Sequence, residues 1–206
     1  MRVSATLLEG YRLYQSTDWK TEADLIDSIK GVFVPTPAMD LGTAFHAVLE
    51  TPETYRVAGG YRSGAYAFDD ATMAPLFALI DRRGVFEVKA TLEFDGHTLV
   101  AKADQLDGAT IREFKTTLST FDAEKYADSY QWRVMSLIFQ PAVITYHVAT
   151  LDDHGNSVVT LKSVDSLSLY PYAGLEQDVR DLLREFVDYV RSKGLNEYLE
   201  RSALAA

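Results

Sequence analysis

Cysteine is absent from the 206 residues of this sequence. Disulfide bonds, zinc sites built on thiolates and iron–sulfur clusters are therefore excluded, and the absence fits a cytoplasmic protein. Long hydrophobic runs are missing as well, because none approaches the roughly 20 residues that a membrane-spanning helix needs. The first ten residues lack the sustained apolar segment and cleavage site of a signal peptide. We therefore expect a cytoplasmic protein without membrane association.

An excess of basic residues is also lacking. The chain has 20 Lys and Arg against 30 Asp and Glu, for a formal net charge of −10. This charge argues against a protein that coats nucleic acid non-specifically. It does not exclude a nuclease, because clustered carboxylates can bind a metal ion and a local basic patch can contact phosphates. Apolar residues make up 47% of the chain, which is enough for the core of a single domain over residues 1–206.

Helical periodicity alternates with strand patterns along the chain. Helices are expected at 4–14, 22–29, 38–50, 69–82, 120–140 and 171–192. Strands are expected at 85–94, 97–106, 109–116, 142–151 and 157–164. Residues 51–67 are rich in Gly, Tyr and Arg and are expected to be irregular. Ser4 is placed as a helix cap, and Thr36 with Pro37 opens the third helix.

Two Asp-Gly pairs, Asp95-Gly96 and Asp107-Gly108, are the strongest local signal. Such pairs favour tight hairpin turns, so the three strands from Val85 onward should form an antiparallel meander. The second turn brings Asp104 towards Glu113, and alternation along the strand places Glu113 and Lys115 on one face. Two carboxylates with an ammonium beside them suit metal-assisted phosphodiester hydrolysis. The alternative is that these charges simply face solvent.

Four further side chains have both a structural and a functional interpretation. His46 lies beside the apolar stripe of its helix, either as a histidine at the edge of the core or as a ligand for metal or phosphate. Gln131 lies next to a buried stripe, where its amide bonds either to the sheet or to substrate. Arg56 and Arg62 belong either to a plain surface loop or to one that contacts nucleic acid.

Four motifs in order resemble those of the PD-(D/E)XK nuclease superfamily. They are the helical Gly42-Thr43-Ala44-Phe45-His46, the strand Ala101-Lys102-Ala103-Asp104, the strand Glu113-Phe114-Lys115-Thr116-Thr117 and the helical Gln131. Within the superfamily the chain looks most like the group of RecE, lambda-exonuclease and RecB-type nucleases, the phage-type exodeoxyribonucleases. Two positions depart from the pattern: Ala101 replaces the usual glycine, and Met135 stands where a tyrosine often lies.

The resemblance implies a restriction-endonuclease-like α/β core, with a mixed central sheet in αβββαβ order flanked by helices. It implies a Mg²⁺ site, with Mn²⁺ as an alternative, formed by His46, Asp104, Glu113 and the carbonyl of Phe114. It assigns catalytic roles to Asp104, Glu113, Lys115 and Gln131. Lys115 would position the attacking water or stabilise negative charge, and Gln131 would orient water or phosphate. Glu87 is a weaker candidate for an outer metal contact, and an exposed strand residue is the favoured interpretation.

The expected activity is a metal-dependent DNA exonuclease of the phage-recombination type that works from linear duplex ends. It would act in the cytoplasm of the bacterial host if the gene is carried by a phage. Two alternatives are an endonuclease or single-strand nuclease of the same superfamily, and a catalytically inactive nuclease fold used as a binding module. The resemblance also implies a ring-forming homo-oligomer and a single-strand annealing protein as candidate partners.

Overall fold

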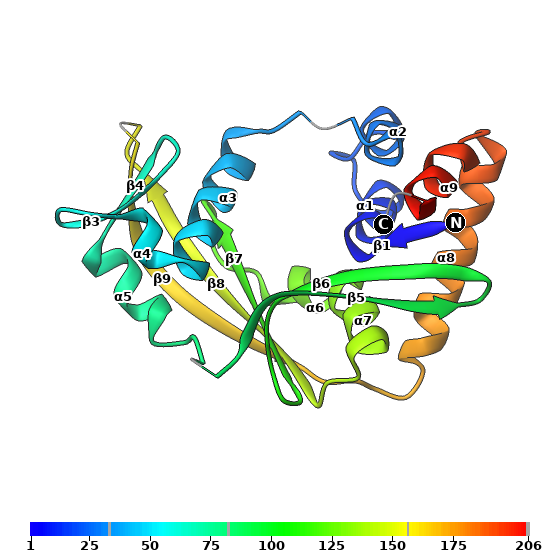
Figure 1. The fold of residues 1–206 in the computed structure, drawn as a ribbon. Helices are drawn as coiled ribbons and strands as arrows, with labels where there is room; N and C mark the ends of the chain where they lie inside the picture. Colours follow the sequence, from blue (N-terminus) through cyan, green and yellow to red (C-terminus); the bar gives the residue numbers. More distant parts are fainter. Residues whose placement is uncertain (33, 82, 156, 205–206) are drawn as a thin grey trace.

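The computed structural model describes residues 1–32, 34–81, 83–155 and 157–204. In chain order the elements are β1 (Arg2–Ser4), α1 (Ala5–Ser16), α2 (Glu22–Lys30), α3 (Pro37–Glu50), α4 (Pro52–Tyr55), β2 (Arg56–Val57), β3 (Gly60–Ser63), β4 (Tyr66–Asp69), α5 (Asp70–Phe77), β5 (Val85–Phe94), β6 (His97–Asp107), β7 (Thr110–Thr117), α6 (Ala123–Ala127), α7 (Tyr130–Phe139), β8 (Val143–Asp153), β9 (Val158–Leu169), α8 (Leu175–Ser192) and α9 (Asn196–Leu204). Figure 1 shows their arrangement.

The strands form one mixed sheet, which has nine members in the described ranges. Its order is β1-β6-β7-β8-β9-β4-β3-β2, and β5 pairs with β6. Parallel pairing joins β1 to β6, β7 to β8 and β4 to β9, while the other neighbours are antiparallel. The expected α/β class with a mixed central sheet is therefore confirmed. The predicted meander is also confirmed, as β5, β6 and β7 joined by turns at Asp95-Gly96 and Asp107-Gly108.

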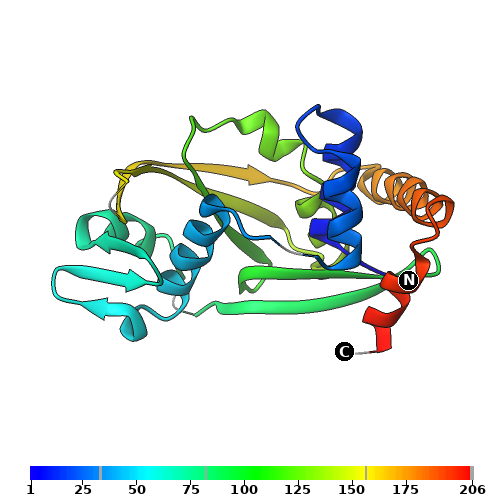
Figure 2. The ribbon, with the colours of Figure 1, turned by 90° about the horizontal axis from the view of Figure 1, so that it is seen from above.

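Helices pack on the sheet in two separate groups, which are spaced apart in both views (Figures 1 and 2). One hydrophobic cluster combines α1, α7 and α8 with the apolar residues of β6 and β8, and includes Leu8, Val134 and Phe186. A second cluster places α3 and α5 against β7, β8 and β9, around Phe45 and Phe114. The candidate site lies where these two groups approach the same strands. Within the described ranges, no helix combines the length and the apolar character needed to cross a bilayer.

The starts of the first helices follow their local sequence. Ser4 caps α1 by accepting a hydrogen bond from the N–H of Leu7, and Thr36 caps α3 with Pro37 as its first residue. Thr21 and Asp24 form a reciprocal capping box at α2, which ends at Gly31 in the left-handed conformation. These caps satisfy N–H and C=O groups that a helix end leaves unpaired. Local chemistry therefore sets these boundaries as the sequence predicts.

The single helix predicted over 120–140 is wrong, because the chain forms α6 and α7 with a break at Ser129. Ser129 is extended, and its hydroxyl accepts a hydrogen bond from the N–H of Gln131. The carboxylate of Glu9 on α1 accepts another from the N–H of Tyr130 at 2.6 Å. A side chain 121 positions away in sequence therefore helps to start α7, which periodicity within the segment does not reveal.

Residues 51–67 are also ordered differently from the prediction, as the short helix α4 and the strands β2, β3 and β4. Strand β4 pairs in parallel with β9, which lies about ninety residues further along the chain. The helix predicted over 69–82 ends at Phe77, and its predicted last residue, Arg82, lies outside the described residues. Strand β1, where only a helix start was predicted, pairs with β6. The pairings of β4 with β9 and of β1 with β6 join segments that are distant in sequence.

Gly60 is required at its position by a close backbone approach. A Cβ at Gly60 would lie 2.2 Å from the carbonyl oxygen of Phe68 and 2.8 Å from the Cα of Asp69 on the paired strand β4. We expect Gly60→Ala to lower the free energy of unfolding by about 1–3 kcal/mol, because backbone atoms cannot move aside cheaply. Urea denaturation measures this change.

The matched control is Gly10→Ala in α1, where a Cβ would meet no atom within 4 Å. There the substitution should raise the free energy of unfolding by about 0.5–1 kcal/mol, because alanine loses less backbone entropy in a helix. Equal effects of the two substitutions would contradict the close approach of β3 and β4.

Candidate active site

The candidate site occupies a gap along one edge of β6. Strand β5 pairs with β6 along nearly its whole length, so β1 and β7 must share the opposite edge. On that edge β1 pairs with residues 98–100, and β7 pairs with residues 105–107. Asp104 lies between the two paired stretches. The sheet is therefore split at this residue, and side chains from both of its faces can approach.

Two carboxylates bridge the split by hydrogen bonding to backbone N–H groups. The N–H of Asp104 donates to Glu113 Oε1 at 3.0 Å, and the N–H of Phe114 donates to Asp104 Oδ2 at 2.8 Å. Each side chain satisfies an N–H that would otherwise lack a partner where the strands separate. The arrangement fixes both carboxylates beside each other, with side-chain exposures of 13% for Asp104 and 1% for Glu113.

Lys115 and Gln131 converge on the second oxygen of Glu113. Lys115 Nζ lies 3.1 Å from Glu113 Oε2, and Gln131 Nε2 approaches the same oxygen at 3.5 Å. Lys115 Nζ also lies 5.7 Å from the ring centre of Tyr146, a fully buried residue of β8. Tyr146 belongs to the site although its strand pattern indicated only an inward-facing residue. The ion pair with Glu113 and the contact with the ring of Tyr146 hold the ammonium of Lys115 in one position.

His46 reaches the site from α3 on the other side of the split. Its Nδ1 lies 3.7 Å from Asp104 Oδ1, and the backbone of Phe114 is close enough to the ring to influence its pKa. Gly42, one turn earlier, faces β7, where a Cβ in its place would make an ordinary contact of 3.5 Å with Thr116 Oγ1. Burial, and then the charge of Lys115, lowers the pKa of His46 to about 4. The imidazole is therefore neutral at pH 7, the form that can bind a metal.

The electrostatics of the site are dominated by buried negative charge. Burial raises the pKa of Glu113 to about 7, although Lys115 opposes the shift. Burial also raises the pKa of Asp104, again against the effect of Lys115. Burial alone would lower the pKa of Lys115, but Glu113 and Asp104 outweigh it and the pKa is raised. One ammonium therefore does not fully compensate two buried carboxylates, so a further cation would be stabilised here.

The donor set fits a hard divalent cation. Asp104 and Glu113 offer carboxylate oxygens, Phe114 offers a backbone carbonyl close to His46, and the neutral imidazole of His46 offers a nitrogen. Oxygen-rich ligation is what Mg²⁺ prefers, and one imidazole is compatible with Mn²⁺. Among the described residues no three His, Asp or Glu side chains form a ready-made metal cluster. The carbonyl of Phe114 and water would therefore have to complete the coordination.

Open space lies on both sides of Asp104. One pocket of about 380 Å³ is lined by His46, Glu50, Glu87, Lys102 and Asp104, among others. A second pocket of about 310 Å³ lies towards the start of α1 and Gln131, and again includes Lys102 and Asp104. Lys89, directly opposite Lys102 on β5, also lines this second pocket. Neither lysine was predicted as a site residue, although Lys102 lies two residues before Asp104 and hence on its face.

Glu87 is not the exposed strand residue that was favoured. It has a φ of 56°, which is rare for a residue with a side chain. Its position in the hairpin is opposite Asp104, and its carboxylate forms an ion pair with Lys102. Glu50, at the end of α3, lies close to Glu87, and burial together with this neighbour raises the pKa of Glu50 to about 7. Glu50 was not foreseen, because nothing in the sequence links the end of α3 to β5.

Arg56 and Arg62 do not lie beside the carboxylates of Asp104 and Glu113. Arg56 forms an ion pair with Asp70, and its guanidinium lies 4.7 Å from the ring centre of Tyr61. Arg62 is exposed on β3. Neither arginine lines the two pockets beside Asp104. Their predicted contact with nucleic acid therefore stays a prediction, whereas His46, Asp104, Glu113, Lys115 and Gln131 do meet in one place.

No family model and no curated protein matches this chain. The structure of an alkaline exonuclease, LHK-Exo from Laribacter hongkongensis, matches with a TM-score of 0.54 at 13% identity, over 99% of this chain and 94% of that one. The structure of LHK-Exo in complex with dAMP matches with a TM-score of 0.51 at 12% identity, over 99% and 94%. The structure of SSO0001 matches with a TM-score of 0.54 at 14% identity, over 91% and 76%. The chain therefore shares its fold with these proteins, among them an alkaline exonuclease.

Proposed function

We propose that this protein is a metal-dependent exonuclease that hydrolyses phosphodiester bonds from the ends of duplex DNA. The observation that carries the proposal is the meeting of Asp104, Glu113 and Lys115 in the split of the sheet, with His46 and Gln131 beside them. The shared fold with an alkaline exonuclease supports the same chemistry. A catalytically inactive binding module would have no need of a lysine held against a buried carboxylate.

Each residue of the site has a role that follows from its position. Asp104, Glu113, the carbonyl of Phe114 and His46 would hold Mg²⁺ or Mn²⁺. When bound, the ion would polarise the scissile phosphate and lower the pKa of a coordinated water. Lys115, whose pKa is raised, stays protonated and can donate hydrogen bonds to the charge that develops on the phosphate. Gln131, in the first turn of α7, can orient the attacking water or a phosphate oxygen.

The lysine pair supplies a place for the DNA backbone. Lys89 and Lys102 are direct neighbours across β5 and β6, and both are exposed beside Asp104. Together with the first residues of α1, they line the pocket that also contains Gln131. Lys102 is paired with Glu87, so it is the positive charge of Lys89 that lessens, at this place, the repulsion of a polyanion by an overall charge of −10. The backbone of the bound strand would therefore pass over β5 and β6 on its way to Asp104.

The test uses linear duplexes labelled at the 5′ or the 3′ end, together with a closed circular duplex, all with Mg²⁺. We expect stepwise loss of label from one end of the linear DNA and no cleavage of the circle. Addition of EDTA should stop the reaction. Cleavage of the circle would support the endonuclease alternative. Absence of all cleavage, with no heat on calorimetric titration of Mn²⁺, would support a binding module.

Phage recombination as the biological setting, a ring-forming homo-oligomer and a single-strand annealing partner are further parts of the proposal. A ring that encloses DNA would keep the enzyme on one strand through many cleavage steps. Analytical ultracentrifugation tests the oligomer directly, because a monomer of 23.0 kDa is well separated from any ring of several copies.

A further inference from the structure

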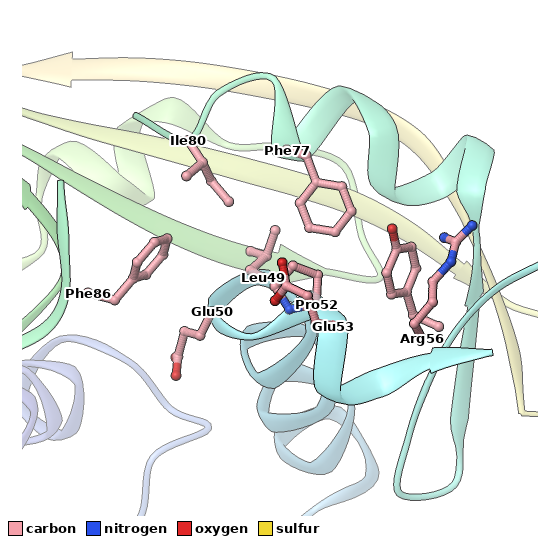
Figure 3. Close-up of a pocket in the computed structure, with 9 residues that line it drawn as sticks. Leu49, Glu50, Pro52, Glu53, Arg56, Phe77, Ile80 and Phe86 are labelled. Carbon is pink, nitrogen blue, oxygen red and sulfur yellow. The ribbon is translucent and has the colours of Figure 1, made fainter. Parts of the chain in front are cut away.

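A third and larger cavity, of about 600 Å³, lies at the C-terminal end of α3. In Figure 3, Phe77 and Ile80 lie above it, Phe86 lies at its left and Glu50 lies below. Leu49 and Tyr61 complete its apolar wall. The elements that form it come from residues 49–61, 77–80 and 86. Its volume is within the range of pockets that bind small organic groups, roughly 300–1,000 Å³.

This aromatic pocket adjoins the candidate active site at two points. Glu50 lines both the aromatic pocket and the smaller pocket that contains Asp104. Phe86 and Glu87 are consecutive residues of β5, and the first lines the aromatic pocket while the second lines the pocket of Asp104. A polymer that lies across Asp104 can therefore place a side group of its neighbouring unit in the aromatic pocket.

The aromatic rings that line the pocket differ in whether they pack against another ring. Tyr61 and Phe77 pack against each other edge-to-face at 5.3 Å between ring centres, and Arg56 covers Tyr61. Phe86 has no ring partner within the described part of the chain, and it is only partly buried. A partly exposed phenylalanine beside a cavity offers a surface on which a flat aromatic group can stack.

The charges around the pocket select a base over a phosphate. Glu50 and Glu53 line it, and the guanidinium of Arg56 is already paired with Asp70. Phosphates of a nucleic acid would be repelled by this acidic lining and attracted instead to Lys89, since Lys102 is paired with Glu87. A nucleobase is uncharged, and its exocyclic amino groups can donate hydrogen bonds to a carboxylate.

We infer that the aromatic pocket binds the base of a nucleotide adjacent to the scissile phosphate, with Phe86 as the stacking surface. This inference rests on the proposed nuclease function and adds a binding site to it. The pocket draws the base out of the duplex and so holds the phosphate at Asp104. The cost of unstacking one base is smallest at a duplex end. The site therefore favours substrates whose terminal nucleotides are free to leave the stack.

The first test compares the cleavage of two linear duplexes, one intact and one in which a terminal nucleotide is abasic. The abasic nucleotide is placed at the 5′ end in one series and at the 3′ end in another. Base–aromatic stacking is typically worth enough to change kcat/KM by roughly 5- to 100-fold. We expect the wild-type protein to cut the abasic duplex slower by that factor. In Phe86→Ala the ratio of kcat/KM for the intact duplex to that for the abasic duplex should be near one, because the substitution slows cleavage of the intact duplex alone. An unchanged ratio in Phe86→Ala, or a wild-type ratio near one, overturns the inference.

The second test does not depend on cleavage. A duplex with an unpaired 2-aminopurine at its end, whose base is not already quenched by stacking within the duplex, is mixed with the protein in EDTA, and quenching of fluorescence reports stacking on an aromatic ring. We expect quenching with the wild-type protein and with Phe86→Tyr, which keeps a ring. Phe86→Leu keeps apolar bulk without a ring and should abolish quenching. Absence of quenching with the wild-type protein overturns the inference, and absence of any cleavage in the first test contradicts the nuclease proposal instead.

The matched control is Tyr170→Ala, at an exposed aromatic residue that lines neither pocket. It should alter neither the abasic ratio nor the quenching. Thermal unfolding of each variant shows whether the fold is retained. Loss of quenching in Tyr170→Ala would show that the fluorescence change arises away from the aromatic pocket and would overturn the assignment of Phe86.

Discussion

Glu113→Gln is expected to abolish metal-dependent cleavage while leaving the protein folded. Glutamine has the shape of glutamate and can still accept the hydrogen bond from the N–H of Asp104. It lacks the charge that would hold a divalent ion and that pairs with Lys115. Cleavage should fall by at least about 10²-fold, the lower end of the cost of removing one charge-stabilising group. A radiolabelled linear duplex with Mg²⁺ measures the loss.

The same substitution should change how stability depends on pH. The pKa of Glu113 is about 7 in the folded protein, against 4.5 ordinarily. In metal-free protein the folded state therefore holds a proton that the unfolded chain has released, and stability falls as pH rises from about 4.5 to 7. His46 acts in the opposite direction, because its folded pKa of about 4 lies below 6.5. Stability of the wild-type protein relative to Glu113→Gln isolates the contribution of Glu113.

Chemical denaturation at several pH values in EDTA gives this difference directly. We expect the wild-type protein to lose stability relative to Glu113→Gln between about pH 4.5 and 7, and the difference to be constant above pH 8. The control is Glu176→Gln on α8, because Glu176 is 63% exposed and forms a surface ion pair with Arg180. A flat difference curve for Glu113→Gln would contradict the buried, uncompensated charge that the metal site requires.

Lys115→Met is expected to reduce cleavage by about 10²–10³-fold, the loss typical of removing a group that stabilises charge in the transition state. It should also destabilise the protein at pH 8 by about 1–3 kcal/mol, because Glu113 loses its ion-pair partner while it stays buried. At pH 5 the cost should be smaller, since Glu113 can then be protonated. Cleavage assays and urea denaturation at the two pH values measure both effects.

A double variant separates the two effects. Glu113→Gln combined with Lys115→Met removes the carboxylate together with the ammonium, so most of the lost stability should return although cleavage does not. Lys162→Met is the matched control, because Lys162 pairs with Asp152 at the surface, where both side chains are largely exposed. Such pairs contribute about 0–1 kcal/mol. Similar losses in Lys115→Met and Lys162→Met would contradict the role given to the buried pair.

Part of the site could be predicted because it depends on short-range geometry. The turn at Asp107-Gly108 fixes the register of β6 and β7, and this register leaves Asp104 opposite Glu113. His46 and Gln131 were reached through the resemblance and not through spacing. The structure brings both to the carboxylates, at 3.7 Å from Asp104 for His46 and at 3.5 Å from Glu113 for Gln131.

Other features could not be predicted because they join segments that are distant in sequence. Glu9 on α1 helps to start α7, and β4 pairs with β9. Glu50 and Glu87 approach each other only because the end of α3 lies near β5 in the folded protein. The aromatic pocket likewise collects residues from α3, β3, α5 and β5. Hydrophobic periodicity within one segment cannot predict contacts between segments that are distant in sequence.

The sequence by itself determined that two hairpins carry Asp104, Glu113 and Lys115 towards one another, because turn type and strand alternation are local properties. Only the tertiary structure decided that β6 and β7 separate at these residues. Strand β1 occupies one part of the edge of β6 and β7 the other, and the gap between them leaves backbone N–H groups without strand partners. Asp104 and Glu113 accept hydrogen bonds from those groups. The split sheet thereby turns two strand carboxylates into a buried site.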